Sequence, residues 1–293
     1  MPLFAIIVAM ALAGAGRWWW FAELFCHFRA QYLAGLLVLA IGFALGRKWR
    51  WLGACAVLAL WNATLITPAF VPPASDPVAR RHARILFLNV EKRNADHAAV
   101  LRLVDEVDPD VACFVEVDPV WMRALLPLMA RYPDVCTRTR GDAFGVAAFS
   151  RLPCTSEIVF LGGELPSTLM RLDGLTIVGT HPVPPMSADH FRWRNDQLRE
   201  LARFAAAQGG PTIIGGDFNC TPWSPMFTDL LRDGLLHDSR RGFGNQASWP
   251  SFFPPLWIPI DHCVHSAGIA VDRRAIGRRV GSDHHPVIVD IRY

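Results

Sequence analysis

The 293-residue sequence lacks several features that would indicate other classes of protein. It contains no Cys-x-x-Cys pair, and its seven cysteines are odd in number and irregularly spaced, so zinc modules are not expected and complete internal disulfide pairing is excluded. No internal repeat is present. Residues 76–293 also lack a basic surplus, with 24 basic and 25 acidic side chains. A protein that grips nucleic acid by its phosphates usually carries such a surplus.

Charged residues are scarce at the start of the chain, where residues 1–75 contain five basic side chains and one acidic side chain, Glu23. Apolar stretches lie there at 1–16, 30–46 and 51–71, and the third is uncharged over about twenty residues, enough for a helix to cross a bilayer. A buried helical hairpin in a soluble protein is the alternative, but little amphipathic pattern is present to face water. We therefore predict a multi-pass protein of the cell membrane, with three transmembrane helices in an anchor over residues 1–71.

The basic residues around these stretches bear on orientation. The turn Arg47-Lys48-Trp49-Arg50 favours the cytoplasm, which would place the C-terminal domain outside. Five arginines on the domain's side of the stretches favour the reverse: Arg17, Arg29, Arg80, Arg81 and Arg84. We expect an extracytoplasmic domain, although the counts leave both orientations open.

Residues 72–83 read as a Pro-rich linker, and residues 84–293 then alternate between strand and helix patterns. We expect strands near 85–90, 110–117, 145–150, 169–172, 176–180, 212–217, 259–265 and 286–292, and helices near 97–107, 188–207 and 225–232. Short β-branched strands with helices between them predict a single α/β domain in which helices cover the sheets.

The most informative stretch is Thr-Ile-Ile-Gly-Gly-Asp-Phe-Asn at residues 212–219. Side chains two apart on an extended chain point the same way, so Asp217 and Asn219 should face one spot while Phe218 turns into the core. The two glycines allow a sharp bend and the close approach of a ligand. The alternative is a strand that ends in a Gly-Asp turn with Asn219 as a helix cap.

Polar side chains also end several other predicted strands. Together they are Asn89, Glu116, His181, Asp217 with Asn219, Asp261 with His262, and Ser282-Asp283-His284-His285. Strand ends in α/β folds converge on one rim, where binding sites usually lie. Each residue alone has a structural explanation, such as a turn cap for Asn89 or an ion pair with an Arg for Glu116. Their joint occurrence favours a functional site.

The ordered set of motifs resembles the endonuclease/exonuclease/phosphatase superfamily, which includes deoxyribonuclease I, exonuclease III, neutral sphingomyelinases and inositol polyphosphate 5-phosphatases. The resemblance covers residues 84–293 and rests on Leu88-Asn89-Val90-Glu91, Phe114-Val115-Glu116, Gly179-Thr180-His181, Gly216-Asp217-Phe218-Asn219, Ile260-Asp261-His262 and Gly281-Ser282-Asp283-His284-His285-Pro286. It implies a four-layer α/β/β/α sandwich of two mixed sheets. It also implies metal-dependent cleavage of phosphate esters, with Mg²⁺, or Mn²⁺ in its place, as cofactor.

The resemblance implies a metal site built from oxygen ligands. Glu116 corresponds to the principal ligand of Mg²⁺, a hard cation that prefers carboxylates. Asn89 is similar to the residue beside the metal and the phosphate, and Asp283 to a second carboxylate near the metal. Glu91 stands where a metal-linked acid sometimes occurs, and a surface position is its alternative.

The same resemblance implies the catalytic roles. Asp217 would orient and deprotonate the attacking water, and Asn219 would hold a phosphate oxygen. His284 would stabilise charge on the phosphoryl oxygens, with its ring held in one tautomer by Asp261. His181 resembles a histidine that helps the leaving oxygen depart in the deoxyribonuclease-like branch.

A zinc site is the chemical rival, because histidines are numerous near these motifs: His181, His262, His265, His284 and His285. We disfavour it because the carboxylates outnumber well-placed histidines. We expect His262 and His285 to pack beside the motif residues. The Asp-x-His and Gly-Asn-His motifs of dinuclear metallophosphatases are also missing.

One aromatic loop, residues 242–259, precedes Asp261 and should overhang the rim, either as a lid packed on the core or as an apolar lip that meets lipid. Together with the anchor and the near-neutral domain, this loop favours a membrane-bound, Mg²⁺-dependent phosphatase or phosphodiesterase. We expect its substrate to be a lipid-linked or small phosphate ester and its other partner to be the bilayer. A nuclease acting on DNA is the first alternative, with nucleic acid disfavoured by charge. A non-catalytic membrane protein that only binds a partner is the second.

Overall fold

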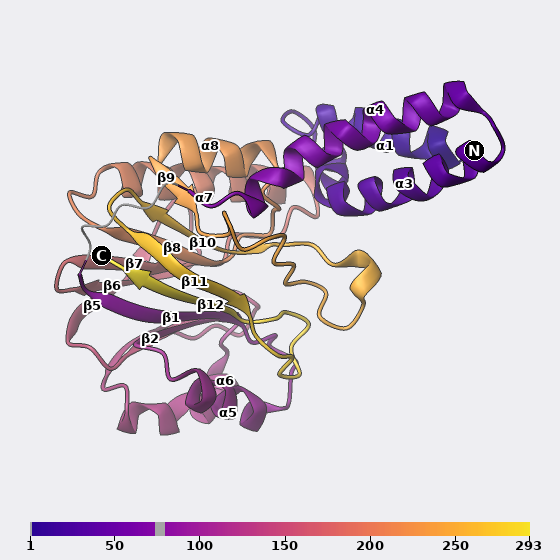
Figure 1. Cartoon of the computed structure of the whole chain (residues 1–293). Coiled ribbons are helices and arrows are strands. Elements are labelled where there is room, and N and C mark those ends of the chain that lie inside the picture. The colour runs from indigo at the N-terminus through magenta and orange to yellow at the C-terminus, as the bar shows by residue number, and fades with distance from the viewer. Residues whose placement is uncertain (1, 74–79) are drawn as a thin grey trace.

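The computed structural model describes residues 2–73 and 80–293, so residues 74–79 of the expected linker lie outside the described part. In the described residues, twelve strands form two six-stranded sheets that pack face to face. Helices α5 and α6 cover the outer face of one sheet, and α7 and α8 cover the outer face of the other (Figure 1). This is the predicted four-layer α/β/β/α sandwich.

The first sheet has the order β11-β12-β1-β2-β4-β3. Its strands are β1 (His82–Asn89), β2 (Val111–Val115), β3 (Asp134–Arg138), β4 (Val146–Ser150), β11 (Ala270–Ile276) and β12 (Val287–Arg292). Only β1 and β2 run parallel among the described pairs, so both end at the same edge.

The second sheet has the order β5-β6-β7-β8-β10-β9. Its strands are β5 (Cys154–Phe160), β6 (Pro166–Leu172), β7 (Leu175–Gly179), β8 (Thr212–Asp217), β9 (Leu236–Asp238) and β10 (Asp261–Ser266). Here β7 and β8 run parallel, whereas β10 lies antiparallel to β8 with Asp261 opposite Asp217. The register therefore places two of the predicted site residues side by side.

Each of the four α-helices of the sandwich begins beside a side chain that caps it, and two 3₁₀ turns accompany them. They are α5 (His97–Val107), α6 (Pro119–Leu125), the 3₁₀ turn η3 (Leu126–Ala130), α7 (Ala188–Ala206), α8 (Pro225–Asp233) and the 3₁₀ turn η4 (Pro254–Leu256). In α5, the side chain of Asp96 accepts a hydrogen bond of 3.0 Å from the amide of Ala99. Val100, Leu103 and Val104 are then buried against the first sheet.

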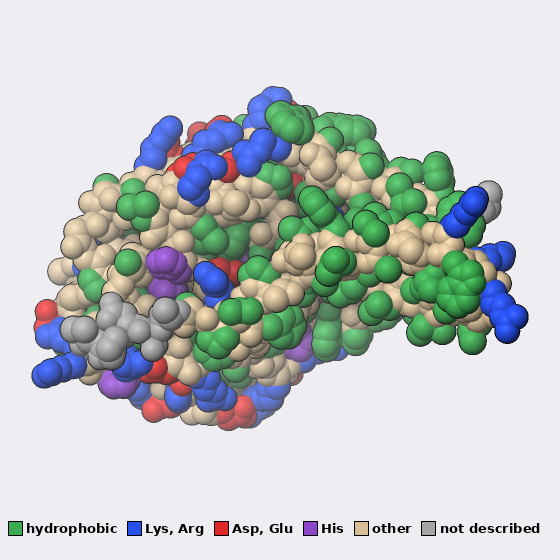
Figure 2. Space-filling view, turned by 45° about the horizontal axis from the view of Figure 1, so that its top comes forward, with side chains coloured by type: hydrophobic (Ala, Val, Ile, Leu, Met, Phe, Trp, Pro, Cys, Tyr) green, Lys and Arg blue, Asp and Glu red, His purple; other side chains and the backbone are tan. Residues whose placement is uncertain are grey.

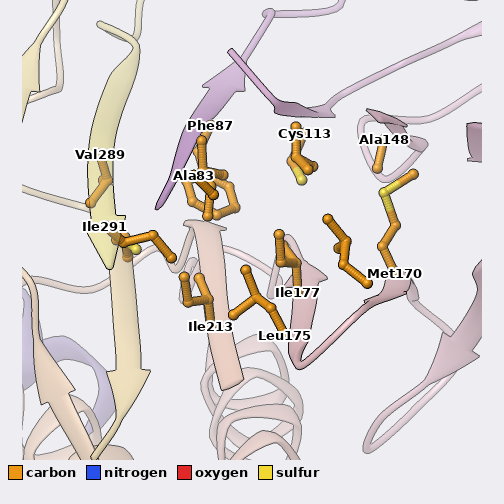
Figure 3. Packing of buried hydrophobic residues seen from close by; sticks show 14 of the residues in the cluster. Ala83, Phe87, Cys113, Ala148, Met170, Leu175, Ile177, Ile213, Val289 and Ile291 are labelled. Atoms are coloured by element: carbon orange, nitrogen blue, oxygen red, sulfur yellow. The ribbon is translucent and has the colours of Figure 1, made fainter. Parts of the chain in front are cut away.

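The inner faces of the two sheets interdigitate in one hydrophobic core (Figure 3). Phe87 from β1 enters the space beside Gly215 of β8, where a Cβ added to the glycine would lie 2.3 Å from the ring. Gly216 has φ +133°, and a Cβ there would lie 2.1 Å from the carbonyl oxygen of Thr180. The paired glycines thus admit a ring from the other sheet and a neighbouring carbonyl.

The N-terminal helical region, residues 2–73, projects to one side of the sandwich (Figure 1). It contains α1 (Pro2–Gly14), α2 (Trp20–Glu23), η1 (Leu24–Phe28), α3 (Arg29–Leu45), α4 (Trp49–Ile66) and η2 (Thr67–Phe70). In the view of Figure 2, hydrophobic side chains cover much of its surface, and Lys and Arg side chains gather at its far tip.

Two segments of this region could cross a membrane by length and composition, namely Trp20–Leu45 with 26 residues and Trp49–Phe70 with 22 residues. Only 11% and 22% of their most apolar stretches are buried, unlike the helices of a soluble core. Helix α1 has 13 residues, and a helix of that length spans about 20 Å at 1.5 Å per residue, less than the bilayer core of about 30 Å. The prediction of a third span therefore depends on the shortest of the three helices.

Candidate active site

Strand ends from both sheets meet at one edge of the sandwich and bring the predicted residues together. Asn89 ends β1, and Glu116 follows β2 directly. Asp217 ends β8, and Asp261 begins β10. Asn89, Asp217 and Asp261 are buried, whereas Glu116 is half-buried. The edge therefore presents polar groups that the surrounding chain shields from bulk water.

The carboxylate of Asp217 is the hub of this cluster. Its Oδ2 lies 3.2 Å from Nδ2 of Asn89 and 3.3 Å from Nε2 of His181. Nε2 of His284 lies 3.6 Å from the same oxygen. One carboxylate oxygen thus faces an amide donor and two imidazole rings, which is an unusual concentration of donors on one buried atom.

These contacts set the charges of the cluster. Burial alone would raise the pKa of Asp217, but the nearby His284 and His181 lower that pKa to about 2. Burial alone would lower the pKa of His284, but the charges of Asp261 and Asp217 raise that pKa to about 10. At neutral pH the site therefore contains an ionised Asp217 beside a cationic His284.

His284 and His181 are both held by a second contact on the other ring nitrogen. Nδ1 of His284 lies 2.8 Å from Oδ2 of Asp261, as the predicted tautomer requires. Nδ1 of His181 lies 3.1 Å from the carbonyl oxygen of Ala143. A carbonyl only accepts hydrogen bonds, so Nδ1 of His181 carries a proton and Nε2 faces Asp217.

Asn219 lies beyond the end of β8 in a left-handed conformation, with φ +51°, so it is not on an extended strand with Asp217 as we expected, and its side chain is anchored to the backbone. Its Nδ2 donates a hydrogen bond of 2.9 Å to the carbonyl of Pro182. Its own amide donates to Oδ1 of Asp217 at 2.9 Å. Asn219 caps no helix, because Ser224 caps α8, and Phe218 is fully buried as predicted. Among the described residues, the second N–H of the Asn219 side chain has no hydrogen-bond acceptor.

A group of acids lies beside Asn89. Nδ2 of Asn89 donates to Oε1 of Glu116 at 3.0 Å, and Oε2 of Glu91 accepts from the backbone amide of Asp283 at 2.9 Å. Burial and the charges of Asp283 and Glu116 raise the pKa of Glu91. In the described part of the chain, no Lys or Arg side chain forms an ion pair with Glu91, Glu116 or Asp283. The nearest cationic ring is that of His284, whose Nε2 lies 3.8 Å from Oδ1 of Asp283. A set of carboxylates without a Lys or Arg partner fits a hard divalent cation.

Backbone strain is concentrated at the same place. Glu91, Glu116 and Asn219 have positive φ values of 55°, 64° and 51°. At Glu91 and Asn219, the strained residue's own amide donates a hydrogen bond to a site side chain. The Glu91 amide bonds Asn89 at 2.9 Å, and the amide of Lys92 bonds Oε2 of Glu116 at 3.0 Å. Strain that neighbours hold in place is typical of functional sites.

A different cluster could also hold an ion by distance alone, because ligand atoms of Asp217, Asp261 and His284 all lie within 4.8 Å of one another. Nδ1 of His284, however, is already bonded to Asp261, and all three side chains are buried. This cluster is better explained as a hydrogen-bonded triad. The half-buried acids around Glu116 are the more accessible metal ligands.

The other motif histidines lie outside the cluster. Nε2 of His262 lies 2.8 Å from the carbonyl of Cys220, and its ring packs 4.4 Å from that of Phe227. Nδ1 of His285 lies 3.1 Å from the carbonyl of Gly277. Both therefore pack beside the motifs, and neither adds a nitrogen ligand to a zinc site.

Three supporting residues were missed by the sequence analysis. Ser282 donates to the carbonyl of Asn89 at 2.7 Å and accepts from the amide of His284 at 3.0 Å. Ser248 accepts from the amide of Asp261 at 3.1 Å, and Nε1 of Trp249 donates to Oδ2 of Asp283 at 3.0 Å. Ser282 lies inside a motif that was recognised, and residues 248 and 249 lie in the loop that was expected to overhang the rim, but no pattern in the sequence predicted these contacts.

Comparison with known proteins identifies the family. Residues 86–284 match the Endonuclease/Exonuclease/phosphatase family, so the chain belongs to this family of metal-dependent phosphodiesterases, nucleases and phosphatases and is an enzyme of that class. The family match includes every predicted site residue. No curated protein matches the chain significantly.

Solved structures share the fold at low sequence identity. A 3' phosphatase, NExo, from Neisseria bound to a product DNA hairpin matches with a TM-score of 0.62 and 19% identity, over 72% of this chain and 100% of that chain. TDP2 from D. rerio complexed with a single-strand DNA product matches with a TM-score of 0.58 and 17% identity, over 73% and 100%. An endonuclease/exonuclease/phosphatase from Beutenbergia cavernae matches with a TM-score of 0.56 and 20% identity, over 73% and 72%.

Proposed function

We propose that this protein is a membrane-anchored, Mg²⁺-dependent phosphoesterase that hydrolyses a lipid-linked or small phosphate ester by in-line attack of water. The observation that carries the proposal is the shared contact of Asn89, His181 and His284 with one oxygen of Asp217, beside acids that pair with no Lys or Arg of the described residues. This arrangement supplies a group that positions water, donors for phosphoryl oxygens and oxygen ligands for a metal.

The predicted metal ligands are the acids beside Asn89. Glu116 would hold Mg²⁺, or Mn²⁺, with Asn89, Asp283 and Glu91 around it. A bound divalent cation would supply positive charge to the phosphoryl oxygens. The indole of Trp249 fixes Asp283, and the amide of Asp283 in turn fixes Glu91. The ligands are thus oriented by neighbours before any ion binds.

Asp217 would orient the attacking water and take its proton as the new P–O bond forms. Because its pKa is only about 2, the carboxylate is always ionised but is a weak base. Orientation of the water is therefore its larger contribution. Burial alone would lower the pKa of His181, but its contact with Asp217 raises that pKa and favours a ring with protons on both nitrogens. The bond to the leaving oxygen would break in line, and that oxygen would take the Nε2 proton of this ring. Cationic His284 and the second side-chain N–H of Asn219 would stabilise charge on the phosphoryl oxygens.

The position of the aromatic loop favours a substrate at the membrane. Phe252, Phe253 and Leu256 are exposed by 60%, 46% and 43%. Nε2 of Gln31 in α3 donates to the carbonyl of Trp257 at 2.9 Å, so the loop is tied to an apolar helix of the N-terminal helical region. Figure 1 shows the loop on the side from which that region projects. The loop would therefore lie near the lipid headgroups as an apolar lip.

An orientation with the domain outside the cytoplasm agrees with this arrangement. The basic turn at residues 47–50 joins α3 to α4. Of the arginines on the domain's side, Arg17, Arg81 and Arg84 pair with acids of the domain. The basic side chains of the turn therefore pair less with acids than the arginines on the domain's side do, and we expect the turn to lie on the cytoplasmic side.

DNA cleavage is the second candidate, because NExo and D. rerio TDP2, with the same fold, were solved with DNA products. The lack of a basic surplus in residues 76–293 disfavours it. A non-catalytic membrane binding protein, the other alternative, conflicts with the family assignment.

A substrate panel tests the proposal. The full chain in detergent micelles is assayed with lipid pyrophosphates, phosphodiester lipids, inositol phosphates and plasmid DNA, first with Mg²⁺ and then with chelator. We expect Mg²⁺-dependent release of phosphate or headgroup from a lipid. The variant Phe252→Ser should lose activity toward lipid substrates, whereas Phe160→Ser, which alters an exposed aromatic on β5, should not. Cleavage of DNA alone would refute the proposal.

A further inference from the structure

The N-terminal helical region places its single acidic side chain inside the catalytic domain. Glu23 ends α2, and Arg194 lies in α7, 171 positions later. Both side chains are completely buried. Nη2 of Arg194 donates to Oε1 and Oε2 of Glu23, each at 2.7 Å. The family match begins at residue 86, so this carboxylate comes from outside the domain that defines the family.

Arg194 connects this contact to the active site. Its Nη1 donates to the carbonyl oxygen of Asn219 at 3.1 Å. Its Nε donates to Oδ1 of Asn195 at 3.0 Å, and Nη2, which also bonds Glu23, donates to the same oxygen at 2.7 Å. Asn219 has a strained backbone, and its amide bonds Asp217. The guanidinium therefore joins a carboxylate of the N-terminal helical region to the turn that follows Asp217.

Two further contacts tie the same segments together. Oγ of Ser224, which caps α8, donates to Oε1 of Glu23. Nδ1 of His27 lies 3.0 Å from Oγ1 of Thr221. Thus α2 and η1 contact both ends of residues 219–224, the loop between β8 and α8. The catalytic domain also holds the loop, through the bond of Asn219 to the carbonyl of Pro182 and the contact of His262 with the carbonyl of Cys220.

The position of the loop depends on the buried ion pair between Glu23 and Arg194. A buried guanidinium needs a charge partner, and removal of one member of a buried ion pair leaves the other uncompensated. Asn195 is neutral, so Glu23 is the only carboxylate that Arg194 contacts in the described residues. Without it, Arg194 would draw water or change position, and the carbonyl of Asn219 would move with it.

We propose that Glu23 is a positioning residue of the active site, which fixes Asn219 through Arg194, so that the N-terminal helical region completes the site. The inference rests on the proposed function for its activity readout. It implies that phosphoester hydrolysis depends on docking of α2 and η1, and that this region is more than a tether.

The test compares Glu23→Gln with Arg17→Gln in the full chain. Arg17 pairs with Asp229 at 2.6 Å, which joins the same two parts of the protein, but it is 41% exposed and does not contact Arg194. We expect Glu23→Gln to lower kcat by about 10²-fold, because displacement of an active-site group by about 1 Å can cost that much. KM and the Mg²⁺ requirement should change little, and Arg17→Gln should match the parent.

Hydrogen exchange gives a readout that needs no substrate. Backbone amides of residues 219–224 should exchange faster in Glu23→Gln and at the parental rate in Arg17→Gln. If Glu23→Gln does not fold, Glu23→Asp, which keeps the charge at shorter reach, should show both changes in weaker form. Should the parent hydrolyse no phosphate ester, the proposed function fails, while exchange still decides this inference.

A double variant tests whether Glu23 acts through Asn219. Interacting residues give non-additive losses. Once Asn219→Ala has removed the side chain, Glu23→Gln should reduce kcat little further. Additive losses, or parental kcat and parental exchange in Glu23→Gln, would overturn the inference.

Discussion

Nδ1 of His284 lies 2.8 Å from Oδ2 of Asp261, and both side chains are buried. Asp261 is placed by its pairing with Asp217 across β8 and β10, so the two acids lie on either side of the ring. The charges of Asp261 and Asp217 outweigh burial and raise the pKa of His284 from 6.5 to about 10. His284 is therefore cationic at neutral pH.

This relationship predicts the alkaline limit of activity. A group is charged below its pKa, so activity that needs cationic His284 should persist above pH 7 and fall as the pH rises toward about 10. Asp261→Asn removes the largest contribution that raises this pKa, so the fall should move to lower pH. Profiles of kcat against pH at constant Mg²⁺ measure the shift. An unchanged alkaline limit in the variant would contradict the assigned role of His284.

Glu116→Gln should weaken Mg²⁺ binding, because an amide lacks the negative charge that attracts a hard cation. The Mg²⁺ concentration for half-maximal activity should rise by at least about tenfold, since even loss of an outer-shell partner costs about 10- to 100-fold. Excess Mg²⁺ should restore part of the activity. Glu106→Gln is the control, because Glu106 pairs with Arg278 on the surface. If both variants keep the parental Mg²⁺ dependence, Glu116 is not the ligand.

Local patterns in the sequence predicted most of the fold. Helix α5 has the predicted bounds, because the apolar residues that define it and the residue that caps it, Asp96, all lie in one short segment. Strands β3, β5, β9 and β11 and helix α6 were not predicted. Much of β5 is exposed, and its polar residues give no buried pattern to detect. Edge strands are defined by their partner strand rather than by their own sequence.

The site was predictable for the same reason, since most of its residues lie in short motifs at strand ends. Contacts between distant segments were not. Glu23 and Arg194 are 171 positions apart, and Trp249 and Asp283 are 34 apart. Nothing in the local sequence pairs such residues, because only the packing of the folded chain brings them together.

DNA binding should be weak. Each phosphate contact releases counterions, so a true DNA-binding protein loses affinity steeply between about 50 and 200 mM salt. With 24 basic and 25 acidic residues beyond position 75, we expect little affinity for duplex DNA even at low salt. Fluorescence anisotropy of labelled duplex with the full chain in detergent measures it. Tight binding with a steep salt dependence would instead favour a nuclease.

The C-terminus should lie outside the cytoplasm, on the side opposite the basic turn at residues 47–50. A reporter that works only outside the cytoplasm, fused after Tyr293, should be active. A second fusion with a reporter that works only inside should be silent. The reverse pattern would refute this orientation and would place the aromatic loop at the inner leaflet.

Asp217→Asn should nearly abolish turnover while the fold and Mg²⁺ binding survive. The new amide oxygen can still accept from the amide of Asn219, and its NH₂ would face Nε2 of His181 and His284, which can accept when neutral. The bond from Asn89 to Oδ2 would be lost, but Nδ2 of Asn89 keeps its bond to Oε1 of Glu116. An amide cannot take the proton of the attacking water, so kcat should fall by about 10²-fold or more. Turnover, melting temperature and Mg²⁺ affinity are compared in parent and variant. If the loss of turnover came with a large fall in melting temperature, Asp217 would be holding the strand-end turn together, and its assignment as the group that positions water would fail.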